Sequence, residues 1–189
     1  TLDGCLNVKG RGGQELVVNG LDAAALKRLR VDGVTLKVVS DGAAALEELT
    51  LGAPAGGLLV ESADSGASRQ DVSIASLSVG EGGIFDATMF DPAHTLVQDM
   101  SFSPNSTLCV RGNPARAFSV SGTLTLPSAL NYLVPPKTQT AATVLTAGNV
   151  AAPEGGVVWT QSPTTRTRRF RIGRKAIEMM GYGMTVTVR

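Results

Sequence analysis

The chain has 189 residues, of which 43% are hydrophobic but only 4% aromatic, and it contains 22 Gly and 17% charged residues. This composition excludes a helical bundle, which would need long stretches rich in Glu, Lys and Leu. It indicates short strands with an aliphatic core, joined by glycine turns. No run of 18 apolar residues is present, which excludes a membrane-spanning helix.

Charge is distributed unevenly along the chain. Residues 160–189 carry seven Arg and Lys against one Glu, a net charge of +6. Residues 1–159 carry ten basic against 15 acidic residues, a net charge of −5. The chain begins at Thr1 without a charged and apolar leader, which predicts a processed chain or a piece of a longer one.

One apolar pattern recurs from the beginning of the chain. A complete copy begins with an apolar residue, two residues of any type, a second apolar residue, one residue of any type and a third apolar residue. A short turn with Gly or Ser follows, and after the turn come two apolar residues separated by one position. The copies, in chain order, are Leu6, Val8, Leu16 and Val18; Leu26, Leu29, Val31, Leu36 and Val38; Leu46, Leu49, Leu51, Leu58 and Val60; Ile74, Leu77, Val79 and Ile84; Val97, Met100, Phe102, Leu108 and Val110; Leu124, Leu126, Leu130 and Tyr132. The residues that mark successive copies are Leu29, Leu49, Leu77, Met100 and Leu124, at spacings of 20, 28, 23 and 24.

The alternation within each half has a period of two, which is the period of a strand. A single copy cannot fold alone, because burying about six aliphatic side chains gains roughly 10–15 kcal/mol while ordering the copy costs on the order of 30 kcal/mol. Stacking the copies resolves this deficit. We therefore predict an all-β fold, a right-handed parallel β-helix (β-solenoid), over residues 1–136. Insertions such as residues 61–71 are expected in loops, and residues 21–29 could form one helical turn.

A leucine-rich repeat is the competing fold, because LKRLRV (26–31) and LEELTL (46–51) look like its strand. The Asn or Cys that forms a ladder in that fold is absent. A second strand also follows the first within a few residues, where a leucine-rich repeat would have a helix or an extended return segment. Both features favour the β-helix.

Residues 137–189 have a different pattern from the repeats before them, and they are predicted to form a C-terminal β cap or terminal coils. Their predicted strands are residues 157–159, 169–172 and 184–188. A cap is expected because an exposed last coil would be an edge prone to aggregation. Trp159 is expected to pack in the core or in this cap.

The repeats resemble the autotransporter-associated β-strand repeats of large bacterial surface and secreted proteins. The resemblance is carried by ELTLGAPAGGLLV (48–60), SLSVGEGGIF (76–85), GTLTLPSALNYL (122–133) and TVLTAGNV (143–150). It implies a right-handed β-helix stalk outside the cell, and it brings no catalytic residues.

Catalytic chemistry has little support in the sequence. His94 is the only histidine, and its DPAHTLV setting indicates a turn that enters a strand. Asp86, Asp91 and Asp99 could approach one another on successive coils, as acidic calcium ligands do in β-helix polysaccharide lyases. Their spacing does not match a calcium loop, and Asp is common in turns. We expect no enzyme activity, no metal and no cofactor.

The basic run TRTRRFRIGRK is the candidate interaction surface. Its residues are Arg166, Arg168, Arg169, Arg171, Arg174 and Lys175. Phe170 and Ile172 alternate with Arg169 and Arg171, so one face of this strand is expected to be buried while the other presents guanidinium groups. The two interpretations are a solvated face paired with neighbouring acids and a contact surface for an acidic partner. Nucleic acid is not the expected partner, because the run has few aromatic residues and the rest of the chain is acidic.

The sequence predicts a non-enzymatic structural module of a secreted or cell-surface protein, either a stalk segment or a self-assembling filament subunit. The expected partners are the chain itself, joined head to tail, neighbouring domains of a longer chain, or an acidic glycan. A carbohydrate-binding or adhesive module and a small β-helix polysaccharide lyase are the alternatives. Cys5 and Cys109 are expected not to bond to each other, and Cys109 is expected to point outward.

Overall fold

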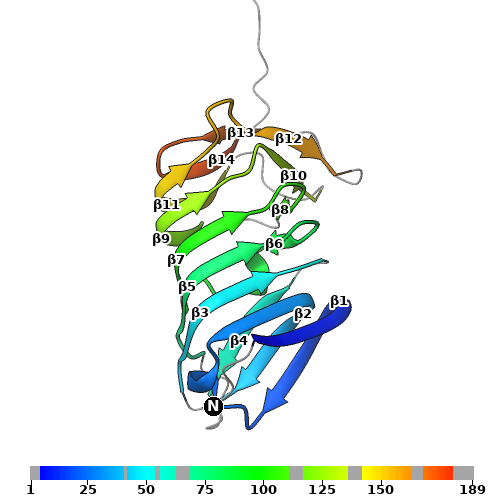
Figure 1. The fold of residues 1–189 in the computed structure, drawn as a ribbon, viewed down its shortest axis with the longest axis vertical. Helices are drawn as coiled ribbons and strands as arrows, with labels where there is room; N and C mark the ends of the chain where they lie inside the picture. The colour runs from blue at the N-terminus through cyan, green and yellow to red at the C-terminus, as the bar shows by residue number, and fades with distance from the viewer. Residues whose placement is uncertain are drawn as a thin grey trace, which may run out of the picture.

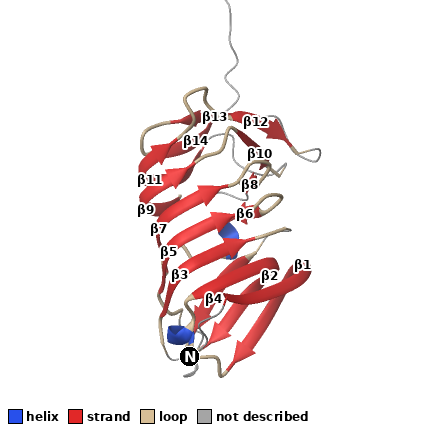
Figure 2. Cartoon of the chain, viewed as in Figure 1, coloured by secondary structure: helices blue, strands red, loops and turns tan. Residues whose placement is uncertain are grey.

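The chain folds as an all-β, parallel β-solenoid of about five turns (Figure 1). The structure is a computed structural model, and it describes residues 5–40, 42–53, 56–62, 69–110, 117–135, 142–162 and 168–180. Within these ranges the helical content is two single 3-10 turns, η1 (Ala23–Ala25) and η2 (Ala87–Met89) (Figure 2). No helix in them is long and apolar enough to cross a membrane.

The strands follow one another with short connections, as the recurring turns predicted. They are β1 (Cys5–Asn19), β2 (Arg28–Val39), β3 (Ala44–Leu51), β4 (Gly57–Glu61), β5 (Val72–Val79), β6 (Ile84–Asp86), β7 (Thr95–Phe102), β8 (Thr107–Cys109), β9 (Phe118–Thr125), β10 (Ala129–Leu133), β11 (Ala142–Ala151), β12 (Val158–Gln161), β13 (Arg169–Ile172) and β14 (Ala176–Met180).

Two sheets form the walls of the solenoid. The long sheet has the order β1-β2-β3-β5-β7-β9-β11-β14-β13, with β4 paired to β2, and the short sheet has the order β12-β10-β8-β6. Each of the five coils contributes two consecutive strands: β3 and β4, β5 and β6, β7 and β8, β9 and β10, and β11 and β12. At the first end, β1 and β2 are long continuous strands, and the second half of β2 pairs with β4.

The register of the long sheet confirms the predicted repeat. Leu29, Leu49, Leu77, Met100 and Leu124 lie opposite one another on successive strands, in the order in which they mark the copies. Each is at most 2% exposed, so they form one continuous apolar ladder through the core. A second strand stacks in each coil where a leucine-rich repeat would need its helix or return segment, which rules out that alternative.

The short sheet differs from the prediction by one residue in the fourth copy. Phe85, and not Ile84, pairs with Leu108, and its side chain is fully buried whereas Ile84 is half-buried. The reason is the preceding turn, in which the amide of Gly83 donates to the carbonyl of Gly80 and thereby sets where β6 begins. The core is also not the purely aliphatic one that the composition indicated, because it contains packed aromatic side chains. Phe85 is the centre of an aromatic cluster with ring-centroid separations of 5.0 to 6.1 Å to Phe90, Phe102 and Phe118.

The parallel stacking continues past residue 136 into β11 and β12, which pair with β9 and β10. The described chain then ends in a hairpin of β13 and β14, which pair antiparallel to each other and to β11. Residues 137–189 thus contain both a terminal coil and a cap strand pair. The predicted strand at residues 184–188 lies outside the described residues.

Candidate functional site

Aromatic side chains pack together at the C-terminal end of the solenoid, where Val158 and Met180 remain 66% and 41% exposed. The ring of Phe170, in β13, stacks on Trp159 at a centroid distance of 4.4 Å and contacts Tyr132 edge-on at 5.1 Å. The amide of Arg168 donates to the hydroxyl of Tyr132 at 3.2 Å, which ties the start of β13 to the short sheet. The prediction that Trp159 packs in the core or in the cap is therefore confirmed.

The predicted basic surface is only partly assembled at this end. Arg169 and Arg171 are exposed on β13 and alternate with Phe170 and Ile172 as predicted, but the apolar face is half-buried where a buried one was expected. The side chain of Arg171 is engaged, because its Nε and Nη2 lie 2.7 and 2.5 Å from Oε2 of Glu178 on β14.

The other members of the predicted surface divide into three groups. Arg174 and Lys175 are exposed in the turn of the hairpin. Arg168 is 6% exposed and so is not part of the surface, because its backbone is drawn against Tyr132. Arg166 lies outside the described residues. The structure thus brings four of the six predicted basic residues together on one hairpin.

The N-terminal end of the solenoid is open. Leu6 and Leu16 of β1 pair with Leu29 and Leu36 of β2 and occupy the same inward-facing positions. Leu29 and Leu36 are 1% and 0% exposed, whereas Leu6 and Leu16 are 38% and 42% exposed. Two of the apolar ladders that run through the core therefore end here on exposed side chains, and among the described strands only β2 pairs with β1.

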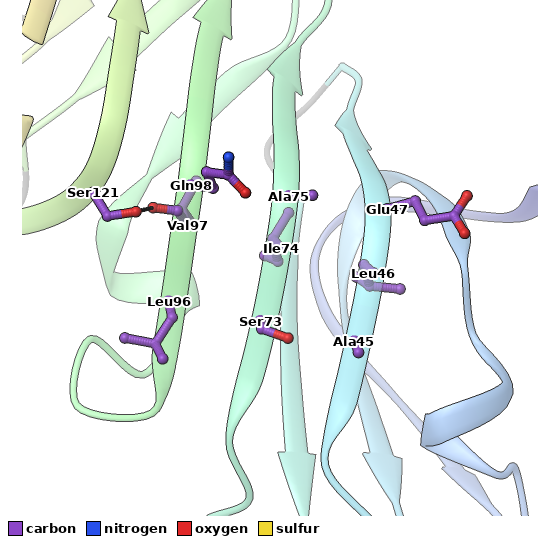
Figure 3. Close-up of a pocket in the computed structure, with 10 residues that line it drawn as sticks. All are labelled: Ala45, Leu46, Glu47, Ser73, Ile74, Ala75, Leu96, Val97, Gln98 and Ser121. Atoms are coloured by element: carbon purple, nitrogen blue, oxygen red, sulfur yellow. Dashed lines mark hydrogen bonds between the residues drawn. The ribbon is translucent and has the colours of Figure 1, made fainter. Parts of the chain in front are cut away.

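A shallow groove of about 390 Å³ crosses the outer face of the long sheet over β3, β5, β7 and β9 (Figure 3). Its floor follows the buried row of Leu46, Ile74 and Val97. Its rim includes Gln98 and the side chain of Leu96, which is 67% exposed and stands out from a face of otherwise small or polar residues.

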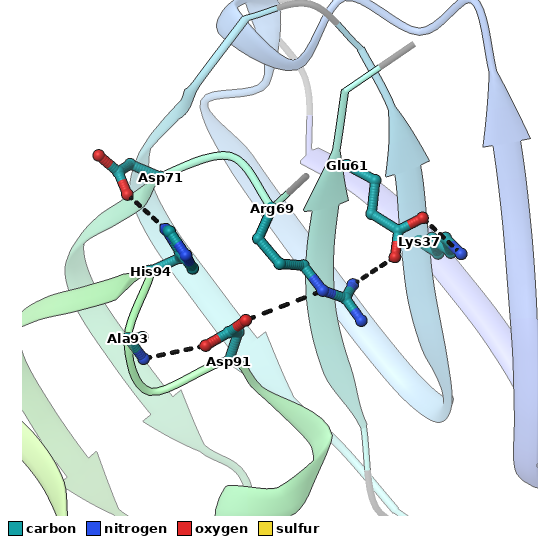
Figure 4. Close-up of polar contacts among 7 residues, drawn as sticks. All are labelled: Lys37, Glu61, Arg69, Asp71, Asp91, Ala93 and His94. Carbon is teal, nitrogen blue, oxygen red and sulfur yellow. Dashed lines mark hydrogen bonds and ion pairs between the residues drawn. The ribbon is translucent and has the colours of Figure 1, made fainter. Parts of the chain in front are cut away.

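A chain of ion pairs links residues from successive coils (Figure 4). Glu61, at the end of β4, is 7% exposed and contacts Nζ of Lys37 at 2.5 Å and Nη1 of Arg69 at 2.8 Å. Arg69 also lies 3.8 Å from Asp91. Sequence reasoning missed this network, because its members come from segments up to 54 residues apart that only the coil register brings together.

The residues considered for catalysis are engaged in local structure. Asp86 accepts hydrogen bonds from the amide and hydroxyl of Thr88 and caps η2, and Asp99 accepts from the amide of Thr123. Asp91 caps its own turn. His94 lies in a turn directly before β7, as predicted, with its Nδ1 3.0 Å from a carboxylate oxygen of Asp71 (Figure 4).

No group of three or more His, Cys, Asp or Glu side chains in the described ranges could hold a metal ion.

The two cysteines lie on different walls and form no disulfide with each other: Cys5 is exposed at the start of β1, and Cys109 is in β8. Cys109, which was predicted to point outward, is 3% exposed and so does not reach solvent. Its neighbour in the adjacent strand, Asp86, is 1% exposed. This row of the short sheet is therefore covered along its outer side.

The comparisons of this chain with protein-family models, with curated proteins and with solved structures found no match.

Proposed function

We propose that the chain is a non-catalytic structural module of a secreted or cell-surface protein, which builds a longer assembly through the open end of its solenoid. The observation that carries the proposal is the exposure of inward-facing leucines on β1 at the N-terminal end. Leu6 and Leu16 are about 40% exposed at the N-terminal end. At the other end, Trp159 and Phe170 stack over the last coil.

The physical reason is that an open solenoid end combines two unsatisfied features. The edge strand presents backbone N–H and C=O groups that have no strand partner on one side. Beside them stand apolar side chains that would gain free energy by leaving water. A further β-strand satisfies both at once, which is how strand addition generates affinity.

The expected location outside the cell rests on the resemblance of the repeats to those of bacterial surface and secreted proteins. Proteolysis of intact cells that express the full-length protein tests it. Digestion of this chain without cell lysis would support a surface location, and complete protection would contradict it.

A carbohydrate-binding module is the second candidate, because the groove in Figure 3 combines an exposed aliphatic side chain with polar ones. Leu96 could pack against a sugar face, while Gln98 on the same strand and Glu47 on β3, two strands away, could donate and accept hydrogen bonds. This arrangement has no aromatic side chain in its lining, which makes it a weaker platform than most sugar sites.

Electron microscopy of the purified protein at increasing concentration, together with a glycan array, separates the two candidates. The structural role predicts particles that are longer than one solenoid and no retention on glycans. Single short particles that bind an immobilised glycan, and lose binding in a Leu96→Ala variant, would replace it with the carbohydrate-binding role.

A further inference from the structure

We propose that β1 pairs antiparallel with β1 of a second copy of this chain and so forms a head-to-head dimer. This inference rests on the structural role proposed above and specifies the partner at the open end. It follows from three features of β1: its free edge, its bend and the order of its side chains.

The free edge of β1 is one side of the longest strand in the protein. β1 has 15 residues and pairs only with β2 among the described strands. In addition to the exposed inward-facing Leu6 and Leu16, β1 carries Val17, which is 48% exposed. A partner strand along this edge would cover apolar side chains and complete the backbone hydrogen bonds at the same time.

The bend divides β1 into two legs, residues 5–9 and 14–19. The register of β1 against β2 shifts between Lys9 and Gln14. Gly12 and Gly13 have φ of 93° and 67°, in the left-handed region of backbone conformation that residues other than glycine rarely adopt. A two-fold axis through this glycine corner would place the first leg of one copy beside the second leg of the other, running in opposite directions, as an isologous interface requires.

The order of side chains fits this symmetry when the axis passes at Gly12. Leu6 then lies opposite Val18 of the partner copy, and Val8 lies opposite Leu16 of the partner copy. All four occupy the inward-facing positions of their legs, since they pair with inward-facing residues of β2. Leu6 and Leu16, the two exposed members of this set, would therefore each be covered by an apolar side chain of the other copy.

The same register makes the outward-facing side complementary in charge. Lys9 lies opposite Glu15 of the partner copy, and the symmetry repeats this pair. Both side chains can be reached from solvent: Lys9 is exposed, and Glu15 is 49% exposed although it forms a 3.9 Å ion pair with Lys37 of its own chain. Oppositely charged residues directly across an antiparallel pair are stabilising, and like charges are destabilising.

Head-to-tail stacking fits the charges less well. β1 carries Lys9 and Arg11 against Glu15, so its net charge is positive. The C-terminal hairpin also presents mainly basic side chains, those of Arg169 and Arg171 among them. The opposite charges at opposing ends that would guide head-to-tail contact are therefore absent from these strands, because β1 and the β13–β14 hairpin both carry more basic than acidic side chains.

Charge exchange tests the dimer by sedimentation velocity across a range of concentrations. Lys9→Glu and Glu15→Lys should each weaken dimerisation by about tenfold or more, because each replaces two attractive pairs by two repulsive ones. The double variant should restore dimerisation. Single variants that dimerise like the wild type, or a double variant that fails to recover, would overturn the proposed register. Circular dichroism controls for folding, which these exposed positions should not affect.

Cysteine cross-linking tests the geometry and identifies the alternative. Cys5 lies opposite Asn19 of the partner copy in this register, within disulfide reach. Asn19→Cys should therefore give a covalent dimer through Cys5 under mild oxidation, identified by peptide mapping. Lys175→Cys, at the tip of the opposite end, is the matched control and should give no bond to Cys5.

The two proposals fail in different ways. A Cys5 bond to the cysteine at position 175 in open fibres would overturn the head-to-head dimer and leave the structural role standing. A chain that stays monomeric at every concentration would overturn the dimer and, with it, the self-assembly in the proposed function.

Discussion

The apolar ladder makes a quantitative prediction about two leucines in equivalent positions. Leu77 is 0% exposed, with Leu49 and Met100 in register on either side of it. Leu6 occupies the same row at the open end, 38% exposed and with only Leu29 beside it. Replacing either leucine by Ala removes three carbon atoms, but the two environments differ in burial and in their freedom to refill the space.

For Leu77→Ala, three buried carbons at about 0.8 kcal/mol each account for about 2.4 kcal/mol. The cavity adds roughly 1–2 kcal/mol, because the neighbouring coils are fixed by their backbone pairing and cannot collapse, so the total is about 4 kcal/mol. For Leu6→Ala, about three fifths of the transfer term applies and no closed cavity forms, so the cost is about 1.5 kcal/mol.

Urea unfolding followed by circular dichroism measures both costs, at a concentration low enough to keep the protein monomeric. The denaturant dependence of the unfolding free energy should be the same in both variants, which checks that unfolding remains cooperative. Equal costs for the two substitutions, or a cost below about 1.5 kcal/mol for Leu77→Ala, would refute the ladder as described.

Three further predictions concern single side chains. Gly57→Ala should destabilise the protein by about 1–3 kcal/mol, because its new Cβ would meet the backbone and Cβ of Met89 in η2, whereas Gly155→Ala, which meets nothing within 4 Å, should be nearly neutral in the same thermal unfolding assay. A maleimide reagent should modify Cys5 at once but the buried Cys109 only on unfolding, and rapid labelling of both thiols in the native protein would contradict the burial of β8. Glu61→Gln should cost about 1–2 kcal/mol, since it removes the charge shared by two cations, and an unchanged urea midpoint would show that the network contributes nothing.

The sequence was sufficient to predict the repeat and its register, for a physical reason. Apolar alternation reports directly which side chains face the core, and stacking of equivalent faces then fixes which residues lie opposite one another. This is why Leu29, Leu49 and Leu77 were identified in the order in which the sheet aligns them. Alternation alone is insufficient where a turn sets which residue of the next strand faces the core. For this reason the inward-facing residue of β6 is Phe85 and not the predicted Ile84.

The contacts at the two ends were predictable only in part. The alternation of Phe170 with Arg169 and Arg171 was visible in the sequence, but the burial of Arg168 depends on Tyr132, which is 36 residues earlier and on the opposite wall. The exposure of Leu6 and Leu16 was also not apparent, because an apolar residue in a regular pattern is normally buried.

Amide hydrogen exchange along β1 and β13, the two terminal strands of the long sheet, tests the central claim that the chain assembles through its N-terminal end, when it is measured as a function of protein concentration. Edge amides of β1 should exchange rapidly in dilute solution and slow as the concentration rises, while those of β13 should not change. Protection that grows at β13 in place of β1, or at neither strand, would contradict an assembly built through the N-terminal end.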